Sequence, residues 1–273
     1  MKPTIFIVDG NYYLHRAYAV TRAVHRDFSI ALSSLYIGMI CKDMAAVRAK
    51  KLLICFDGPA VFRFELWPYY KANRREAHTA VDNTVPGREG AKEIYTYLDG
   101  IKALLTEIGM PFVQYDKYEA DDCCCSAATQ YKDSYNVVIG TKDKDSYQYL
   151  DADVSLYDSS YKVHGEAKPR YITANMVKEL QALTGDAVDN IPEILGPRQA
   201  KLLIKKYGTI KNAMAKDKEY HDMLLPKLEE LKRNAKLVTL IKDVKLPKAA
   251  DLIVKKAVLD EERTFRLDEI GRE

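Results

Sequence analysis

The sequence predicts an α/β fold whose central sheet is mostly parallel and flanked by helices. Three apolar runs, at 4–8, 51–56 and 136–140, have the length and residue types of buried strands. Helix-compatible stretches separate these runs, and each run leads into a carboxylate. Because the carboxyl ends of parallel strands lie along one edge of a sheet, we expect these acids to converge there.

The intervals between the strands show helical periodicity. The clearest example spans 96–108, where five apolar residues recur at helical spacing and Gly109 follows as a C-terminal cap. Asp121 and Asp122 open a later helix, where the helix dipole favours negative charge. In chain order we expect helices at 11–22, 29–48, 96–108 and 121–131, a short strand at 111–115 and a hairpin at 153–164.

The chain changes character after this core. Short helices follow it, with Gly196 and Pro197 opening one of them and Gly208 closing it. A stretch that mixes basic and aromatic residues also interrupts the core and has only weak apolar periodicity. We therefore expect an α/β core at 1–170 with an irregular region at 59–95, a helical domain at 171–245, and a charged C-terminal segment at 246–273 whose role is open.

The composition excludes several classes of protein. A chain of 273 residues, 47% of them apolar, can bury a substantial core, so disorder is not expected. The N-terminus has no targeting pattern, and no apolar run reaches the roughly 18 residues of a membrane span. The five cysteines suit neither a disulfide framework nor a zinc site. We expect a cytoplasmic protein that is neither secreted nor embedded in a membrane.

The formal net charge of +3 conceals an uneven distribution. If the acids gather in one cleft, the remaining surface is basic, which suits a polyanion held by the flanks of that cleft. A mixed, solvated surface explains the same net charge. Charge alone does not decide between these two interpretations.

Pairs of carboxylates at short spacing indicate a metal site with oxygen ligands. Residues two apart on an extended strand end point to the same side, and residues three apart on a helix share a face. Carboxylates about 4 Å apart repel by roughly 1 kcal/mol even in water, so a cluster of them requires bound cations. Mg²⁺ or Mn²⁺ suits such a set, and two ions could clamp the attacking water and the leaving oxygen of a phosphoryl displacement. The pairs are Asp143 with Asp145 on a strand end, Glu119 with Asp121, and Asp186 with Asp189 on a helix.

Eight motifs occur in order between about residue 4 and residue 208. They are Val8-Asp9-Gly10-Asn11, Leu14-His15-Arg16-Ala17-Tyr18, Phe56-Asp57, Phe62-Arg63, Tyr70-Lys71-Ala72-Asn73-Arg74, Glu119-Ala120-Asp121-Asp122, Lys142-Asp143-Lys144-Asp145 and Thr184-Gly185-Asp186-Ala187-Val188-Asp189-Asn190-Ile191-Pro192. As a set they resemble the phage and bacterial 5′-nucleases, the flap endonuclease and 5′–3′ exonuclease superfamily. The resemblance implies a PIN-like nuclease core, a helical arch at 59–95 and a small helix–three-turn–helix domain, with its helix-hairpin-helix, at 171–245. It also implies a stand-alone form without a polymerase domain, since the chain ends near residue 273.

The resemblance further implies two divalent ions, Mg²⁺ or Mn²⁺, one held tightly and one more loosely. Nine acids match the positions of the family's metal ligands, and we assign Asp121 and Asp143 as catalytic. Histidine or cysteine ligands are not needed. The nine are Asp9, Asp57, Glu119, Asp121, Asp122, Asp143, Asp145, Asp186 and Asp189.

Basic residues match the family's contacts to its substrate. Lys71 and Arg74 correspond to the pair at the foot of the arch that contacts the scissile phosphate, where both can stabilise the added negative charge of the transition state. Without the resemblance, the same stretch is typical of a solvated basic helix face. The DNA contacts that we expect are Arg16, Arg63, Tyr70, Lys71, Arg74, Arg75, Gly196 and Arg198.

Three positions depart from the family pattern. The hairpin at 194–198 has one glycine where the family has two, so we expect a smaller anion cradle there, and a bound K⁺ in the hairpin is in doubt. Lys142 stands where glycine is common. The triplet Cys123-Cys124-Cys125 replaces aliphatic residues.

We interpret the chain as a divalent-metal-dependent 5′-nuclease, with flap endonuclease and 5′–3′ exonuclease activity on DNA in replication and repair. The expected substrates have 5′ ends or flaps with duplex and single-stranded portions, and RNA primers are a further candidate. A monomer is the default assembly. One alternative is a non-catalytic scaffold for branched DNA, which the intact set of acids disfavours. The other is a DxD-type metal-dependent phosphatase, which would leave the basic stretch at 62–78 without a purpose.

Overall fold

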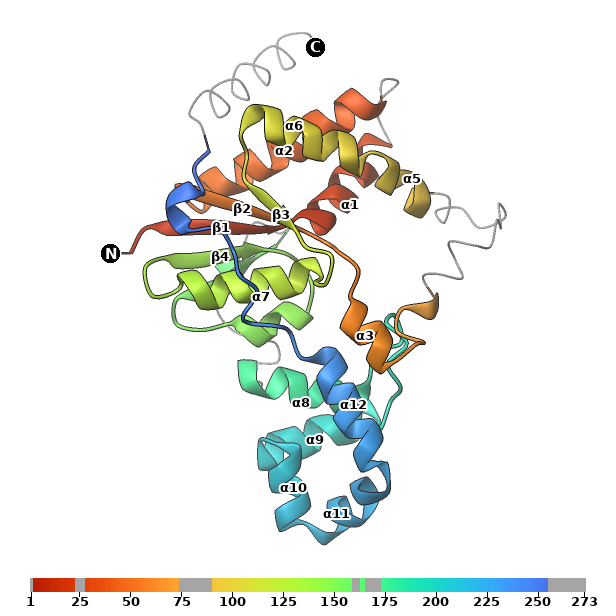
Figure 1. Cartoon of the computed structure of the whole chain (residues 1–273). Helices are drawn as coiled ribbons and strands as arrows, with labels where there is room; N and C mark the ends of the chain where they lie inside the picture. The colour runs from red at the N-terminus through yellow and green to blue at the C-terminus, as the bar shows by residue number, and fades with distance from the viewer. Residues whose placement is uncertain (1, 23–27, 74–89, 159–162, 165–172, 255–273) are drawn as a thin grey trace.

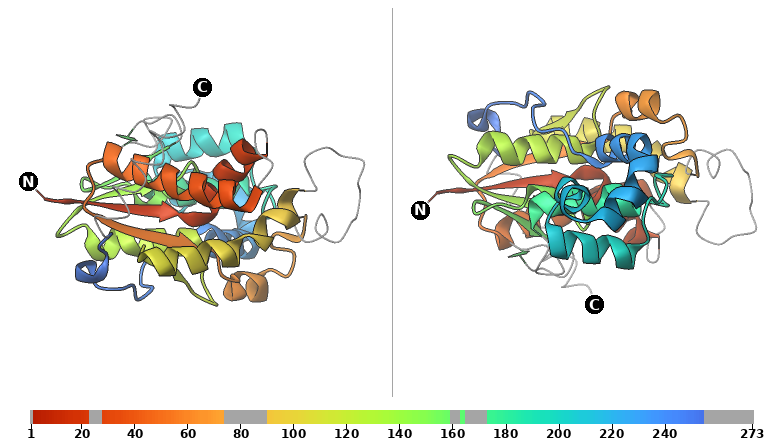
Figure 2. Two further views of the ribbon diagram at one scale, coloured as in Figure 1. Left: turned by 90° about the horizontal axis from the view of Figure 1, so that it is seen from above. Right: turned by 90° about the horizontal axis from the view of Figure 1, so that it is seen from below.

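The structure consists of an α/β core and, below it in Figure 1, a smaller helical domain. It is a computed structural model that describes residues 2–22, 28–73, 90–158, 163–164 and 173–254. In the view from below, the helical domain lies in front of the core (Figure 2). Among the helices of these ranges, none combines the length and the hydropathy needed to cross a membrane.

Six strands form one sheet in the order β3-β2-β1-β4-β5-β6. Neighbouring strands from β3 to β5 pair in parallel, which confirms the mostly parallel sheet, and β5 and β6 pair antiparallel as expected of the hairpin. The register aligns Asp9 with Cys55 and Val8 with Gly140, so β1, β2 and β4 end almost level with one another. The strands are β1 (Thr4–Asp9), β2 (Lys51–Phe56), β3 (Phe112–Gln114), β4 (Asn136–Gly140), β5 (Val154–Tyr157) and β6 (Val163–His164).

Helices cover both faces of the sheet (Figure 1). Successive residues of β1 point to opposite faces, so Phe6 and Val8 belong to one apolar core while Ile5 and Ile7 belong to the other. The second core is closed by α7 (Ala120–Tyr131). The first is closed by α1 (Gly10–Thr21), α2 (Phe28–Ala46), α5 (Gly90–Thr96) and α6 (Leu98–Ile108).

The helical domain has an apolar core of its own. Pro197 occupies the first turn of α9, and Gly208 follows the helix with a φ of 78°, as the sequence predicts. Tyr70 and Ala60, from the region that interrupts the α/β core, also pack into this apolar core. The helices are α8 (Ala174–Thr184), α9 (Pro197–Tyr207), α10 (Ile210–Lys216), α11 (Lys218–Leu224) and α12 (Leu228–Val238), and α3 (Val61–Leu66) contacts α12.

An extended segment after α12 runs back along the core, and we call residues 240–254 the return segment. Backbone N–H groups of the return segment donate hydrogen bonds to side chains of α7 that lie four residues apart. Further along, Leu52 N of β2 donates to Leu252 O at 3.4 Å. The described part of the C-terminal segment, 246–254, therefore packs on the core. The α7 pairs are Asp122 with Ile241 (3.0 Å), Ser126 with Val244 (3.1 Å) and Gln130 with Leu246 (3.4 Å).

The expected conformation of Asp143 and Asp145 is wrong. Strand β4 ends at Gly140, so neither acid lies on an extended strand end. Asp145 instead opens a 3₁₀ helix, Asp145–Tyr149, and Asp143 precedes it in an irregular segment.

The expected helix at Asp186 and Asp189 is also wrong, because both lie in a turn. The preceding helix ends at Thr184, and Gly185 follows with a φ of 62°. A Cβ on Gly185 would lie 2.4 Å from the carbonyl oxygen of Ile191, so the tight turn requires glycine for space as well as for its backbone conformation.

We expect Asn234→Leu to destabilise the helical domain. Asn234 is fully buried in α12, and its side-chain amide donates to Ala182 O at 3.2 Å and Pro192 O at 2.7 Å. Leucine would leave both carbonyls without this donor, and each buried group left unsatisfied costs about 1–3 kcal/mol. Urea denaturation measures the loss. Lys236→Leu, at an exposed position of the same helix, is the control. An Asn234→Leu protein as stable as the wild type would contradict this account.

Candidate metal and nucleic-acid site

The first carboxylate of the site also caps a helix. Asp9 ends β1, and its Oδ1 accepts a hydrogen bond from Tyr12 N of α1 at 2.9 Å. Its Oδ2 accepts from the Thr141 hydroxyl at 3.2 Å. With only 9% of the residue exposed, Asp9 is fixed at the edge of the sheet by both contacts.

Asp57 follows β2 and reaches the start of α7. Its Oδ1 accepts from Ala120 N at 2.8 Å, while its own N–H donates to the side chain of Asn11 at 3.1 Å. Glu119 is the N-cap of α7, and Asp121 lies in the first turn of that helix. Asp57 thus holds the helix that carries the next two acids.

Two more acids follow β4. Asp143 N donates to the Thr141 hydroxyl at 3.2 Å, and Asp143 Oδ1 accepts from Asp145 N at 2.9 Å. The irregular segment therefore folds around the Asp143 carboxylate. Gln181 of α8 donates to Asp145 Oδ1, so a side chain of the helical domain orients an acid of the core.

The last two acids come from the helical domain. Asp186 pairs with Ile191 through backbone hydrogen bonds of 2.9 and 2.8 Å, which close the turn. Within the turn, Asp186 Oδ1 accepts from Val188 N at 2.7 Å and from Asp189 N at 3.2 Å. One carboxylate thus stabilises the loop that presents the other.

The turn at Lys71 interlocks with this loop. Lys71 N donates to Asp189 O at 3.0 Å, and Asn73 N donates to the side-chain oxygen of Asn190 at 3.3 Å. Lys71 and Asn190 have left-handed φ values of 52° and 56°, which non-glycine residues rarely adopt. The Lys71 ammonium contacts Glu119 and lies 3.8 Å from Asp189, so it links an acid of the core to an acid of the helical domain.

Burial and mutual repulsion raise the pKa values of several of these acids. Desolvation, followed by the charge of Asp57, raises the pKa of Asp9 to about 7. Desolvation and the charge of Asp143 raise the pKa of Asp145 to about 7. The pKa of Asp121 is also raised, first by burial and then by the charge of Asp9. The apo site therefore resists the full ionisation of its acids.

A single cavity of about 260 Å³ collects most of the predicted site. Eight of the nine predicted metal ligands line it, together with Lys71, and they come from both domains. The eight are Asp9, Asp57, Glu119, Asp121, Asp143, Asp145, Asp186 and Asp189.

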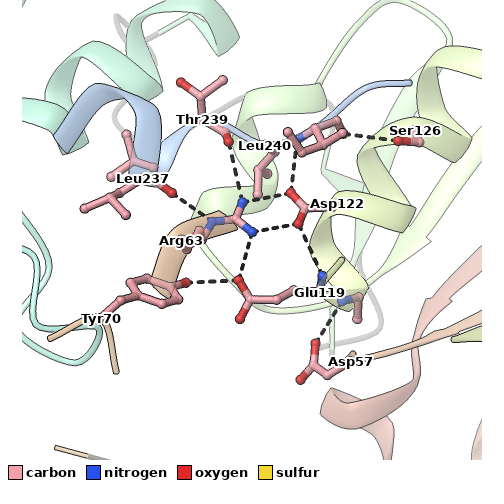
Figure 3. A network of polar contacts seen from close by, with 12 residues as sticks. Asp57, Arg63, Tyr70, Glu119, Asp122, Ser126, Leu237, Thr239 and Leu240 are labelled. Carbon is pink, nitrogen blue, oxygen red and sulfur yellow. Dashed lines mark hydrogen bonds and ion pairs between the residues drawn. The ribbon is translucent and has the colours of Figure 1, made fainter. Parts of the chain in front are cut away.

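The predicted role of Asp122 as the ninth metal ligand is wrong. It is fully buried, and Arg63 binds both of its oxygens, at 2.7 and 2.8 Å (Figure 3). Arg63 is one of the expected DNA contacts, but it is 2% exposed, and although it lines the inner wall of the cavity its guanidinium binds Asp122 and Glu119. A buried carboxylate already paired in this way is not available to a metal ion, and a buried guanidinium is not available to a phosphate.

Two further expected DNA contacts also bind other residues of the protein, although Tyr70 lines the cavity. Tyr70 is 3% exposed, and its hydroxyl lies 3.0 Å from Glu119 Oε2 and 3.2 Å from Asp189 Oδ2. Arg16 lies over the Tyr13 ring and donates to the buried Asp43 at 3.3 Å. Both side chains hold the protein together where the sequence predicted contacts to substrate.

The other expected contacts have different outcomes. Arg74 and Arg75 lie outside the described residues. Gly196 is the N-cap of α9, and Arg198 is exposed in the first turn of that helix. Neither of these two lines the cavity, so a contact with DNA there would lie away from the acids.

Sequence reasoning assigned no role to several residues that line the cavity. His15, Tyr12 and Tyr95 supply an aromatic wall, and the Tyr95 hydroxyl lies 3.5 Å from His15 Nε2. Their sequence signals are the position of Tyr12 and His15 in the first two turns after Asp9 and the place of His15 in the Leu14–Tyr18 motif. Tyr95 and Gln181 join the site only through tertiary packing, so spacing could not have found them.

The donor set suits a hard divalent cation. The acids that line the cavity offer only oxygen, and Asp121 Oδ1 is buried with no hydrogen-bond partner in the described residues. Within those residues, no three Asp, Glu, His or Cys side chains lie close enough together to hold a metal ion as they stand. Repulsion between like charges favours a spread arrangement of this kind. The oxygen ligands of these acids and the unsatisfied Asp121 Oδ1 therefore fit a divalent ion.

Comparisons with known proteins match residues 4–260 to one family. The N-terminal resolvase-like domain of the 5′–3′ exonucleases matches residues 4–181, and the C-terminal SAM fold of the same family matches residues 172–260. The 5′–3′ exonuclease of Aquifex aeolicus is 26% identical over 252 residues, which cover 88% of this chain and 83% of that protein. DNA polymerase I of Deinococcus radiodurans is 30% identical over 216 residues, which cover 76% of this chain and 21% of the polymerase.

A solved structure shares the fold. The flap endonuclease of bacteriophage T5, in a pseudo-enzyme–product complex with DNA and metal ions, superposes with a TM-score of 0.71. The match is 22% identical and covers 97% of this chain and 98% of that one. Because the family models match both domains, the chain belongs to the 5′–3′ exonuclease family.

Proposed function

We propose that this protein is a divalent-metal-dependent 5′-nuclease that hydrolyses phosphodiester bonds in DNA with 5′ ends or flaps. One observation carries the proposal: acids from both domains line the same cavity as Lys71. Bound Mg²⁺ or Mn²⁺ ions would polarise the scissile phosphate and supply a nucleophilic water. The family includes 5′–3′ exonucleases, and the structural neighbour is a flap endonuclease, which supports both modes of cleavage.

The protein's own residues would orient the reaction. Asp9, Asp57, Asp121 and Asp143 belong to the α/β core and line the cavity, and they would hold the more tightly bound ion. Asp186 and Asp189 come from the helical domain and would reach the second. Lys71 lies between Glu119 of the core and Asp189 of the helical domain, where its ammonium can stabilise negative charge that develops on the phosphate.

Other parts of the surface would hold the substrate away from the acids. Arg198 and the N-terminal N–H groups of α9 form a positive site suited to a backbone phosphate of the duplex. Because contacts to phosphate read no bases, this grip should be independent of sequence. An RNA primer paired to DNA offers the same phosphates, so the proposal includes it as a substrate. The proposal also includes that the protein acts as a monomer.

The first test uses a DNA flap labelled at its 5′ end, with and without Mg²⁺. We expect the wild type to cut only with the metal, and Asp143→Asn or Asp121→Asn to abolish cutting while DNA binding is kept or tightened. Loss of an acid weakens metal ligation and also reduces repulsion of the phosphate. Asp99→Asn, whose carboxylate is 91% exposed on α6, is the control.

The alternatives give different results in the same assay. A scaffold would bind the flap without cutting it. A phosphatase would release the terminal phosphate and leave the flap intact. Loss of binding together with cleavage in Asp143→Asn would count against the assigned role of that acid.

We expect Lys71→Ala to lower turnover more than affinity. Removal of an electrostatic stabiliser of the transition state typically costs on the order of 100- to 1,000-fold in rate. Single-turnover cleavage at saturating protein measures the effect. Lys50→Ala, an exposed lysine that precedes β2 at the opposite edge of the sheet, should cleave at the wild-type rate. A normal rate for Lys71→Ala would reduce Lys71 to a phosphate contact.

Metal binding should stabilise the protein more at high pH than at low pH. The pKa values of Asp9 and Asp145 rise from 3.8 to about 7 on folding. Between these values the unfolded chain has released protons that the folded apo protein retains, so apo stability falls as pH rises from about 4 to about 7. Divalent ions bind the ionised acids and offset that loss. Melting temperatures with and without Mg²⁺ at pH 5.5 and pH 8 test this, and a shift that does not depend on pH would contradict it.

A further inference from the structure

We propose that Arg63 and Asp122 form a buried pair of positioning residues, which sets one oxygen of Glu119 and leaves the other for a metal ion. Neither residue would contact metal or DNA itself. This inference rests on the proposed function, because Glu119 matters as a ligand only if the site binds metal.

Asp122 has no hydrogen-bonding capacity left for a ligand. Its Oδ1 accepts from Arg63 Nη2 at 2.8 Å and from Ile241 N at 3.0 Å. Its Oδ2 accepts from Arg63 Nη1 at 2.7 Å and from Glu119 N at 3.2 Å. The residue is fully buried and does not line the cavity, so its four contacts are all structural.

Arg63 divides its guanidinium between two acids with different surroundings. Besides its bidentate pair with Asp122, Nη1 donates to Glu119 Oε2 at 3.0 Å. The Tyr70 hydroxyl lies 3.0 Å from the same oxygen. Glu119 Oε1 instead contacts Lys71, beside the cavity. The two oxygens of Glu119 are therefore distinguished: the nearly buried Arg63 and Tyr70 hold one, and the partly exposed Lys71 pairs with the other at the cavity.

The same guanidinium joins three distant parts of the chain (Figure 3). Arg63 lies on α3, Glu119 and Asp122 begin α7, and Arg63 Nε donates to Leu237 O at the end of α12 at 3.0 Å. Thr239 O accepts a longer contact at 3.5 Å. The orientation of Glu119 therefore depends on the docking of the helical domain, through one side chain.

Folding stability gives only a weak reason for such a pair. Buried ion pairs are often replaceable by uncharged residues of similar volume with little loss of stability, whereas the removal of one partner is strongly destabilising. A role in positioning makes a different demand, since partners that orient metal ligands typically affect metal affinity 10- to 100-fold. When both charges are removed together, the melting temperature should therefore recover while the metal affinity stays low.

The test measures Mn²⁺ binding to DNA-free protein by the electron paramagnetic resonance signal of the free ion, alongside the melting temperature. The variants are Arg63→Met, Asp122→Asn, the double variant with both changes, and Arg63→Lys. The control is the double variant Lys132→Met with Asp151→Asn, which removes an ion pair outside the site and should keep wild-type Mn²⁺ affinity.

We expect the double variant to melt above Arg63→Met, because no buried carboxylate is left with its cation missing. Its Mn²⁺ affinity should stay about 10- to 100-fold below that of the wild type and within about threefold of Arg63→Met. Arg63→Lys, which can hold one carboxylate but not both, should fold and bind Mn²⁺ with intermediate affinity. If Arg63→Met does not fold, the Mn²⁺ affinity of Arg63→Lys relative to the wild type tests the inference instead.

Two results would overturn the inference while leaving the proposed function intact. Wild-type Mn²⁺ affinity in the double variant would show that the pair serves folding alone. A further loss of tenfold or more when Asp122→Asn is added to Arg63→Met would show that Asp122 is itself a ligand. A wild-type protein that neither binds Mn²⁺ nor cuts a flap would refute the proposed function and this inference with it.

Discussion

Repulsion among acids gathered at one edge of the sheet is the constraint on which the rest of this structure depends. Parallel strands that end level with one another bring Asp9, Asp57 and Asp143 together whatever the cost in electrostatic energy. The fold meets that cost with local donors: the start of α1 and the Thr141 hydroxyl for Asp9, and the start of α7 for Asp57. The pKa of Asp9 is raised first by burial and then by the charge of Asp57, so its donors compensate only in part.

The helical domain also supplies donors that offset the repulsion among these acids. Gln181 donates to Asp145, and Lys71 stands between Glu119 and Asp189. The turn at Lys71 and the loop at Asn190 each adopt a left-handed conformation to interlock. Such conformations persist where the surrounding contacts determine them, and here they hold Lys71, whose ammonium lies between acids of both domains. The site is therefore completed by docking of the domains.

Much of this arrangement could be predicted from the sequence, because strand composition and helical periodicity are local signals. The sheet, the helices on both faces and eight of the acids at the cavity follow from such patterns and from the family motifs. The errors come from tertiary contacts. Spacing suggested a helix at Asp186, but Gly185 and the Ile191 carbonyl dictate a turn. Motifs predicted that Arg63 contacts DNA and that Asp122 binds metal, yet the two bind each other in the interior. No pattern in a sequence reports which charge finds which partner.

The return segment bears on the order in which the molecule can be assembled. Lys51 of β2 contacts the carbonyl oxygen of Ala250, 199 residues later in the chain. At a synthesis rate of about 5–20 residues per second, a ribosome needs roughly 10–40 s to add that stretch. Over this interval the nascent core lacks Leu240, Val244 and Leu252 from its second apolar cluster, and the polar row on α7 lacks its backbone donors. The core that is synthesised first is thus among the last parts of the protein to reach its final packing.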